Sequence, residues 1–182
     1  MSQGKLIVIS GASGVGKGTV LGLMMEKRKD LSFSVSATTR EPRPGEVEGQ
    51  HYFFVTTERF LEMIDQDAFL EYDKHNACYY GTPRAQVELK RQQGHVLLDI
   101  EPKGAEMVRR AVPDAVLIFI MPPSMEDLER RLRGRGDTPE DQISMRLERA
   151  KWEMEQRFWY DHVVVNDDAN RCAQEILTII GE

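Results

Sequence analysis

The sequence predicts a three-layer α/β fold, with a central parallel sheet and helices on both of its faces. Short apolar runs with the length of buried strands alternate with longer stretches of helical periodicity, and the first run is followed at once by a glycine-rich turn. Strands that alternate with helices of about 10 to 15 residues are joined by right-handed crossovers, which makes the sheet parallel. The 182 residues fit a single domain, since a chain of this length buries about 70% of its unfolded surface.

The core elements follow the chain in order. Residues 5–10 contain four consecutive aliphatic side chains and stop at a glycine, which predicts a strand buried on both faces. From residue 17 to about 29, apolar residues recur at helical spacing and the end is basic, as is favourable at a helix C-terminus. Similar apolar runs at residues 96–98, 116–120 and 163–165 each precede a helical pattern and predict further strands of the sheet.

Two segments interrupt this core pattern. Within residues 33–80, short aromatic and β-branched pieces are separated by proline and glycine, which predicts an antiparallel insertion that covers one end of the sheet. Residues 134–139 separate two polar helices, the second running from about 139 to 159, and this break suits a mobile lid. The predicted division is a core of about residues 1–32, 83–128 and 160–182, an insertion of about 33–82 and a lid of about 129–159.

Composition excludes several classes of function. The formal net charge of −6 argues against nucleic acid as a partner, because non-specific binding to phosphate backbones depends on a basic surface. No apolar run approaches the ~20 residues that cross a bilayer, and the first residues lead into a strand, so we expect a cytoplasmic protein with no membrane partner. Cys78 and Cys172 are far apart, which favours inert thiols. The histidines are scattered as well, and we expect no metal cage made of protein side chains; they are His51, His75, His95 and His162.

A phosphate-binding loop (P-loop) follows the first predicted strand. The pattern G-x-x-x-x-G-K between a buried strand and a helix is the context that distinguishes this motif from a merely tight glycine turn. Its backbone N–H groups converge on phosphate oxygens, the helix N-terminus adds partial positive charge, and Lys17 reaches the β and γ phosphates. The predicted ATP-binding residues here are Gly11, Ala12, Ser13, Gly14, Val15, Gly16, Lys17, Gly18 and Thr19.

The metal site departs from the usual motif. Gly18 stands where Ser or Thr normally holds Mg²⁺, and the hydroxyl comes one residue later at Thr19. Either Thr19 serves the phosphates while Mg²⁺ is held mostly by phosphate oxygens and waters, or the metal site is weaker than usual. Asp99, at the carboxyl end of a predicted strand, resembles the Walker-B acid and is assigned to Mg²⁺ through water. The alternative is that Asp99 only caps the next helix.

Residues 36–46 lead on to Gly49 and Tyr52, and this stretch closely resembles the GMP-binding signature of guanylate kinases. The resemblance covers nearly the whole chain. It implies ATP-dependent, Mg²⁺-dependent phosphorylation of GMP, and by extension dGMP, to the diphosphate. The Gly18–Thr19 pair also resembles the loop of adenylate kinases. Other stretches that carry the resemblance are residues 69–72, 79–83, 98–100, 131–136, 143–147 and 160–167.

An anionic acceptor is best gripped by guanidinium forks on a stiff loop, and Arg40 and Arg43 lie three residues apart on a proline-bearing segment. Tyr52 and Tyr80 can donate hydroxyls to the same phosphate. Taken alone, the arginines could equally be solvated loop charges. Beside a P-loop, a phosphate site is favoured.

Base selection is implied by the resemblance. Glu71 would face the guanine N1–H and 2-amino donors, while Ser36 and Thr82 would face O6. Adenine offers neither pattern, and a buried carboxylate left without donors costs more than a lost contact, so discrimination reaches several powers of ten. Without the resemblance, Glu71 would be taken for a surface strand residue. Asp99 and Glu101 complete the implied GMP site, although Glu101 departs from the aspartate usual in the family.

Catalysis should need no general base, because the second pKa of a phosphate is about 6 and the acceptor is already anionic at neutral pH. What remains is to align donor and acceptor and to neutralise developing charge. Candidates are Lys17, Arg40, Arg135 and Arg146, the last two resembling lid arginines that close over ATP; the alternative for each is a solvated helix charge. By resemblance alone, Asn166 borders the adenine.

Two other functions compete with this one. Guanylate-kinase-like domains of membrane-associated scaffold proteins bind peptides without catalysis, but they commonly lack an intact P-loop and belong to longer chains. A kinase for another nucleoside monophosphate or a phosphorylated sugar is supported only by Gly18 and conflicts with Glu71. The expected partners are small nucleotides, ATP and GMP, and nothing in the pattern indicates a protein partner.

Overall fold

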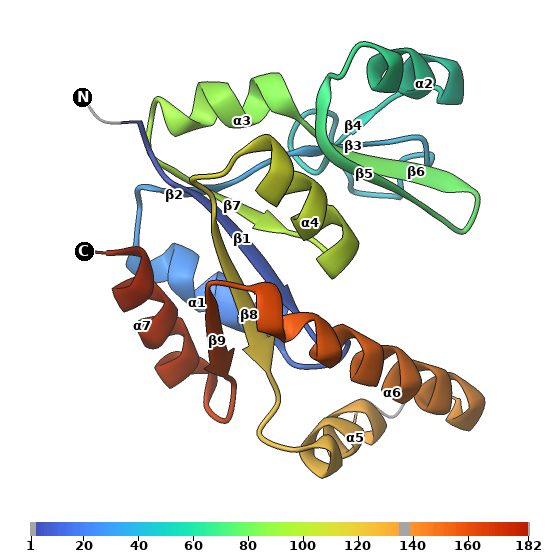
Figure 1. The fold of residues 1–182 in the computed structure, drawn as a ribbon. Coiled ribbons are helices and arrows are strands. Elements are labelled where there is room, and N and C mark those ends of the chain that lie inside the picture. The colour runs from blue at the N-terminus through green and yellow to red at the C-terminus, as the bar shows by residue number, and fades with distance from the viewer. Residues whose placement is uncertain (1–2, 135–138, 182) are drawn as a thin grey trace.

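The central sheet of the computed structural model, which describes residues 3–134 and 139–181, has five parallel strands between two layers of helices (Figure 1). Its spatial order is β2-β7-β1-β8-β9, and every neighbouring pair is parallel. The predicted fold class is therefore confirmed. The strands are β1 (Leu6–Gly11), β2 (Leu31–Phe33), β7 (His95–Asp99), β8 (Val116–Met121) and β9 (His162–Val165).

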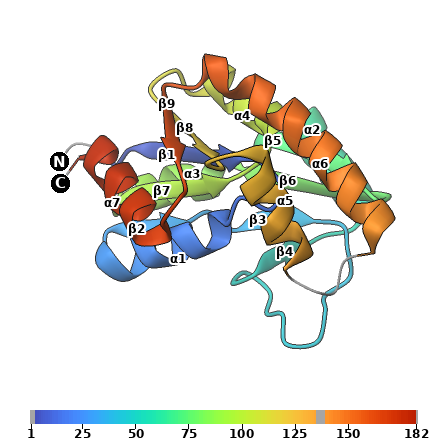
Figure 2. The ribbon, with the colours of Figure 1, turned by 90° about the horizontal axis from the view of Figure 1, so that it is seen from below.

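Alternate residues of β1 supply two hydrophobic layers. Ile7 and Ile9 pack in a core cluster with α1 (Lys17–Lys27) and α7 (Ala169–Ile180). Leu6 and Val8 pack on the other face, in a cluster with α3 (Arg84–Arg91) and α4 (Pro102–Ala111). Each fully buried aliphatic side chain contributes about 1.5–3 kcal/mol. Figure 2 shows α1 and α4 on opposite sides of the sheet.

The insertion forms its own sheet in the order β4-β3-β6-β5. A small aromatic core supports it, in which the rings of Phe60 and Phe69 stack with centroids 4.4 Å apart. The pairs β3–β6 and β5–β6 are antiparallel, as expected, but β3–β4 is parallel. The expectation of an antiparallel insertion holds for two of the three strand pairs and fails for β3–β4, because residues 39–51 form a connection of the dozen or so residues that a parallel return needs. The elements are β3 (Ser36–Thr38), β4 (Tyr52–Phe54), α2 (Thr57–Asp65), β5 (Phe69–His75) and β6 (Cys78–Pro83).

The lid segment consists of α5 (Met125–Arg133), α6 (Glu140–Glu155) and a last 3-10 turn, η1 (Gln156–Trp159). Ser124 caps α5 by accepting the Asp127 N–H, as favoured at a helix start. Arg135, a predicted catalytic and ATP-binding residue, lies outside the described residues. Within the parts of the chain that the structure describes, none of the helices has the length and apolar character needed to cross a membrane.

Candidate active site

The P-loop joins the end of β1 to the start of α1 and lines a cavity of about 370 Å³. Gly14 and Gly16 have φ values of 85° and 91°, in the left-handed region that favours glycine. A Cβ on Gly16 would lie 2.9 Å from Nδ2 of Asn166, so the close approach also requires glycine. A cradle of backbone N–H groups at a helix N-terminus, with Lys17 beside it, fits the phosphate groups of a nucleotide.

The back of the loop is fixed by two side chains from distant elements. Nδ2 of Asn166 and Nη1 of Arg131 both donate to the Val15 carbonyl, at 2.8 and 3.0 Å, and Nη2 of Arg131 donates to the Asn166 carbonyl at 2.8 Å. Asn166 is only 4% exposed. The structure thus places Asn166 behind the loop, as a support for its backbone, and Arg131 ties α5 to the same carbonyl.

Lys17 and Asp99 meet at the carboxyl edge of the sheet. Ile9 pairs in register with Asp99, so the end of β7 lies beside the P-loop. Nζ of Lys17 lies 2.5 Å from Oδ1 of Asp99. The Asp99 carboxylate and the exposed hydroxyl of Thr19 are the oxygen donors that Mg²⁺ prefers, whereas Gly18 offers none. The donor set therefore fits a magnesium ion held mainly through water and phosphate.

A second cavity, of about 160 Å³, lies between the insertion and the core. Glu71 lines it while only 7% exposed, and its Oε1 accepts the Thr82 hydroxyl at 2.5 Å. A Cβ on Gly104 would lie 2.8 Å from Oε2 of Glu71, so glycine at that position leaves room for the carboxylate. Burial raises the pKa of Glu71, which the Thr82 hydrogen bond only partly opposes.

The cavity brings together most of the predicted GMP-binding residues. Strands β5 and β6 pair Glu71 with Thr82 and Asp73 with Tyr80. Because side chains alternate along a strand, Asp73 and His75 share the face of Glu71. Thr82 lines an adjoining cavity with Ser36. The predicted residues that line the 160 Å³ cavity are Ser36, Tyr52, Glu71, Tyr80, Asp99 and Glu101.

The two acceptor arginines are placed differently. Arg40 forms a two-pronged pair with Glu46, at 2.9 and 3.0 Å, and its guanidinium lies 5.4 Å from the centre of the Tyr52 ring. Arg40 holds the pKa of Glu46 at about 2. Arg43 donates its backbone N–H to Glu46 at 2.8 Å, and its side chain is exposed. Neither arginine is among the described residues that line the cavity. Glu46 takes the Arg40 fork that a phosphate would take, and the Arg43 side chain is exposed.

Three side chains of types that bind metals lie close together, although the sequence analysis expected no metal site among the scattered histidines. Ligand atoms of Asp73, His75 and Glu101 all lie within 4.8 Å of one another. Both carboxylates already have a cationic partner: Lys103 binds Asp73 at 2.6 Å, and Arg149 binds Glu101. The alternation along β5 could have placed Asp73 and His75 together, but the approach of Glu101 is a tertiary contact.

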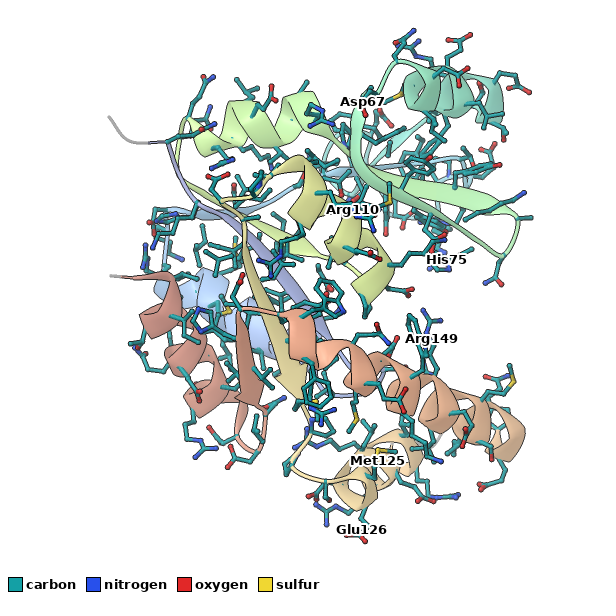
Figure 3. All side chains as sticks on the ribbon, viewed as in Figure 1. Asp67, His75, Arg110, Met125, Glu126 and Arg149 are labelled. Atoms are coloured by element: carbon teal, nitrogen blue, oxygen red, sulfur yellow. The ribbon has the colours of Figure 1, made fainter. Side chains whose placement is uncertain are left out.

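Two further residues of the P-loop cavity, Arg149 and Glu153 on α6, carry no motif by which the sequence analysis could have identified them. Oε2 of Glu153 accepts the Ser13 N–H at 2.7 Å, and Nε of Arg149 donates to Oε1 of Glu153 at 3.0 Å. Arg146, one turn earlier, is half-buried and is not among the described residues that line this cavity. Figure 3 shows Arg149 on the side of α6 that faces His75 of β5.

Known proteins resemble this chain in sequence and in fold. A family model described as guanylate kinase matches residues 3–182. A guanylate kinase of Trichodesmium erythraeum (strain IMS101) is 48% identical over 181 residues, which cover 99% of this chain and 97% of that protein. The crystal structure of guanylate kinase from Anaplasma phagocytophilum is 35% identical with a TM-score of 0.74, covering 98% of this chain and 85% of that one.

The SH3-kinase fragment of tight junction protein 3 has a TM-score of 0.50 at 13% identity, with 99% of this chain and 57% of that one covered, and that likeness concerns the fold alone. The Trichodesmium relative matches from end to end, and the family model spans both the P-loop and the pocket of Glu71. On these grounds, this chain belongs to the guanylate kinase family.

Proposed function

We propose that this chain transfers the terminal phosphoryl group of ATP to GMP, forming ADP and GDP, with Mg²⁺ as the cofactor. The observation that carries the proposal is the juxtaposition of two cavities, one built on a P-loop and the other on a buried carboxylate. The first suits a triphosphate and the second suits a base that donates hydrogen bonds. Free nucleotides are the expected partners, and the cytoplasm is the compartment in which we expect the reaction.

Selection of the acceptor rests on Glu71. Its ionised carboxylate accepts the guanine N1–H and 2-amino hydrogens, while the hydroxyls of Ser36 and Thr82 are the candidates for O6. Adenine would leave the buried Glu71 carboxylate with no donor beyond the Thr82 hydroxyl, and a buried acceptor oxygen without a partner costs the full desolvation of the group. Tyr52 and Tyr80, farther along the cavity, are the proposed contacts to the GMP phosphate, together with Arg40 and Arg43 once Glu46 is displaced.

Phosphoryl transfer needs alignment and charge compensation more than proton transfer. An oxygen of the GMP phosphate attacks the γ-phosphorus, the bond from that phosphorus to the bridging oxygen breaks, and ADP leaves with the electron pair. With its second pKa at about 6, the attacking phosphate is already anionic at neutral pH. Lys17, Arg40, Arg135 and Arg146 are the proposed cations for this step. Bound Mg²⁺, held through water by Asp99, would offset charge on the β and γ phosphates.

Product analysis tests this proposal. Purified protein with ATP, Mg²⁺ and GMP should yield ADP and GDP in equal amounts, resolved by ion-exchange chromatography, and dGMP should be accepted as well. AMP, UMP and dTMP should be far poorer acceptors, and chelation of Mg²⁺ should stop the reaction. If GMP stays unchanged while the circular dichroism spectrum is that of a folded α/β protein, the proposal fails.

Asn166→Ala should loosen the P-loop without touching the acceptor pocket. The variant loses the buried bond to the Val15 carbonyl, so we expect a cost of about 1 kcal/mol in the free energy of unfolding. The KM for ATP should rise several-fold while the KM for GMP stays unchanged. Urea titration and steady-state kinetics measure both effects, with Asn170→Ala, at an exposed position on α7, as the matched control. An unchanged KM for ATP would show that this bond does not shape the loop.

A further inference from the structure

The two cavities meet at Glu101, which among the described residues is the one that lines both of them. Lys17 lines the first cavity and Asp99 the second, and their ion pair spans the same junction. A group passed between nucleotides held in the two cavities must cross this point. A cation fixed here is therefore positioned to meet the transferred phosphoryl group.

Arg149 is such a cation. It lines the P-loop cavity from α6, its Nη2 donates to Oε1 of Glu101 at the junction, and its Nε donates to Glu153. The other carboxylate oxygen of Glu101 lies 3.8 Å from Nε2 of His75 in the insertion. The guanidinium thus lies where lid, core and insertion come together, on the side of α6 that faces β5 (Figure 3).

Glu153 fixes the position of the Arg149 side chain relative to the P-loop. Glu153 is 4% exposed, and its carboxylate accepts hydrogen bonds from both the Ser13 N–H and Nε of Arg149. A buried carboxylate with two donors is a stiff support, so the orientation of the guanidinium is set by the loop backbone. Such preorganisation is what allows a donor to stabilise charge without reorganising during the reaction.

The charges at the junction favour a phosphate contact. Lys17 and Arg149 are the cations among the described residues that line the P-loop cavity. A guanidinium has five N–H donors in a planar fork, and the bonds to Glu101 and Glu153 use Nε and one Nη2 donor. The remaining donors suit the oxygens of a phosphoryl group.

We propose that Arg149 is a catalytic residue that contacts the phosphoryl group in transit, with Glu101 and Glu153 as positioning residues. The inference rests on the proposed function, since it assigns a role within the same transfer. It adds to Lys17 and the expected lid arginines a cation that no motif marked.

Arg149→Met tests the contact. We expect kcat to fall about 10²-fold, the usual effect of removing one donor to developing charge, while the KM values for ATP and GMP change little. Guanidinium ion in the buffer should restore part of the rate. Arg110→Met is the matched control, because Arg110 is an exposed helical arginine on α4, paired with Glu106; its kcat should match that of the wild type. Arg149→Lys, which keeps the charge but not the fork, replaces the methionine variant if that one unfolds early on heating.

Binding of a bisubstrate analogue distinguishes a direct contact of Arg149 with the phosphates from a purely structural role. An analogue that joins adenosine and guanosine through five phosphates fills both cavities and the junction. Calorimetry should find its affinity weakened about 30-fold or more by Arg149→Met, as expected for loss of charge-assisted bonds to phosphate, with ADP and GMP bound singly as before. Unchanged affinity for the analogue would overturn the inference.

The alternative role for Arg149 is only to neutralise the carboxylates of Glu101 and Glu153, and a second substitution distinguishes that role. If Glu101→Gln restores the kcat of Arg149→Met to near the wild-type value, neutralisation explains the effect and the contact is refuted. If the wild-type protein leaves GMP unphosphorylated, the proposed function itself is refuted. If the wild type is active and Arg149→Met has the same kcat, only the role of Arg149 is refuted.

Discussion

Replacing Lys17 with methionine is expected to lower kcat about 10³-fold with every acceptor that the protein uses. Lys17 lines the P-loop cavity and lies 2.5 Å from Asp99 at the junction of the two cavities. Its ammonium is positioned to stabilise the negative charge that spreads over the phosphoryl group during transfer. Removing one such donor commonly lowers kcat about 10²- to 10³-fold. Initial rates with GMP and with the poor acceptor AMP measure the effect.

The control for Lys17→Met is Lys27→Met, at the exposed end of the same helix, which should leave kcat unchanged. Stability should change little in either variant, because the Lys17–Asp99 pair is partly exposed and such pairs contribute about 0–1 kcal/mol. A loss of rate confined to GMP would contradict the role given to Lys17, since the contact is to the donor phosphates.

Glu71→Gln is expected to lower kcat/KM for GMP roughly 10³-fold and to leave the rate with AMP nearly unchanged. The amide replaces one acceptor oxygen with a donor that faces the guanine donors. The loss corresponds to two hydrogen bonds to a charged group, at about 1.5–3 kcal/mol each. Steady-state kinetics with both acceptors measure the split, and an equal loss with both would refute the assignment of base selection to Glu71.

The same variant should be more stable than the wild type at neutral pH. Burial raises the pKa of Glu71, so the folded chain binds its proton more tightly than the unfolded chain does. The free energy of unfolding of the wild type therefore falls as the pH rises from the ordinary glutamate pKa through the raised one. Glu71→Gln removes that dependence, and its advantage in melting temperature should shrink as the pH is lowered. A variant less stable than the wild type at pH 7 would show that burial of the ionised Glu71 carboxylate does not destabilise the folded protein.

Local sequence patterns were sufficient for the parts of the site that lie close together along the chain. The strand, loop and helix of residues 6–27 came from apolar runs and glycine spacing, and the same logic put Asp99 at the sheet edge beside Lys17. Glu71 and Thr82 were implied only by the resemblance, which pointed the Thr82 hydroxyl at O6, whereas the structure has that hydroxyl donate to Glu71. The Lys17–Asp99 contact depends on strand ends meeting at one edge of a parallel sheet, which the pattern already predicts.

Other contacts depend on how distant elements rotate against each other, and no local pattern encodes that. Glu153 and Ser13 are 140 positions apart, and only the packing of α6 on the P-loop brings the carboxylate to the backbone. Arg40 differs for a local reason, because the carboxylate of Glu46 on the same loop competes with a phosphate for its guanidinium. The parallel pairing of β3 with β4 depends on the path of a long loop, which composition does not determine.

The central claim is that a P-loop and a separate pocket keyed by Glu71 make this chain a kinase that selects guanine. Internal competition measures that selection most directly, with GMP and AMP at equal concentration in one reaction with ATP and Mg²⁺. A label in the adenine ring of ATP distinguishes the ADP left by the donor from the unlabelled ADP formed from AMP. The ratio of GDP to unlabelled ADP gives the ratio of kcat/KM values. We expect a ratio of about 10³ or more in favour of GMP. A ratio near one would contradict it.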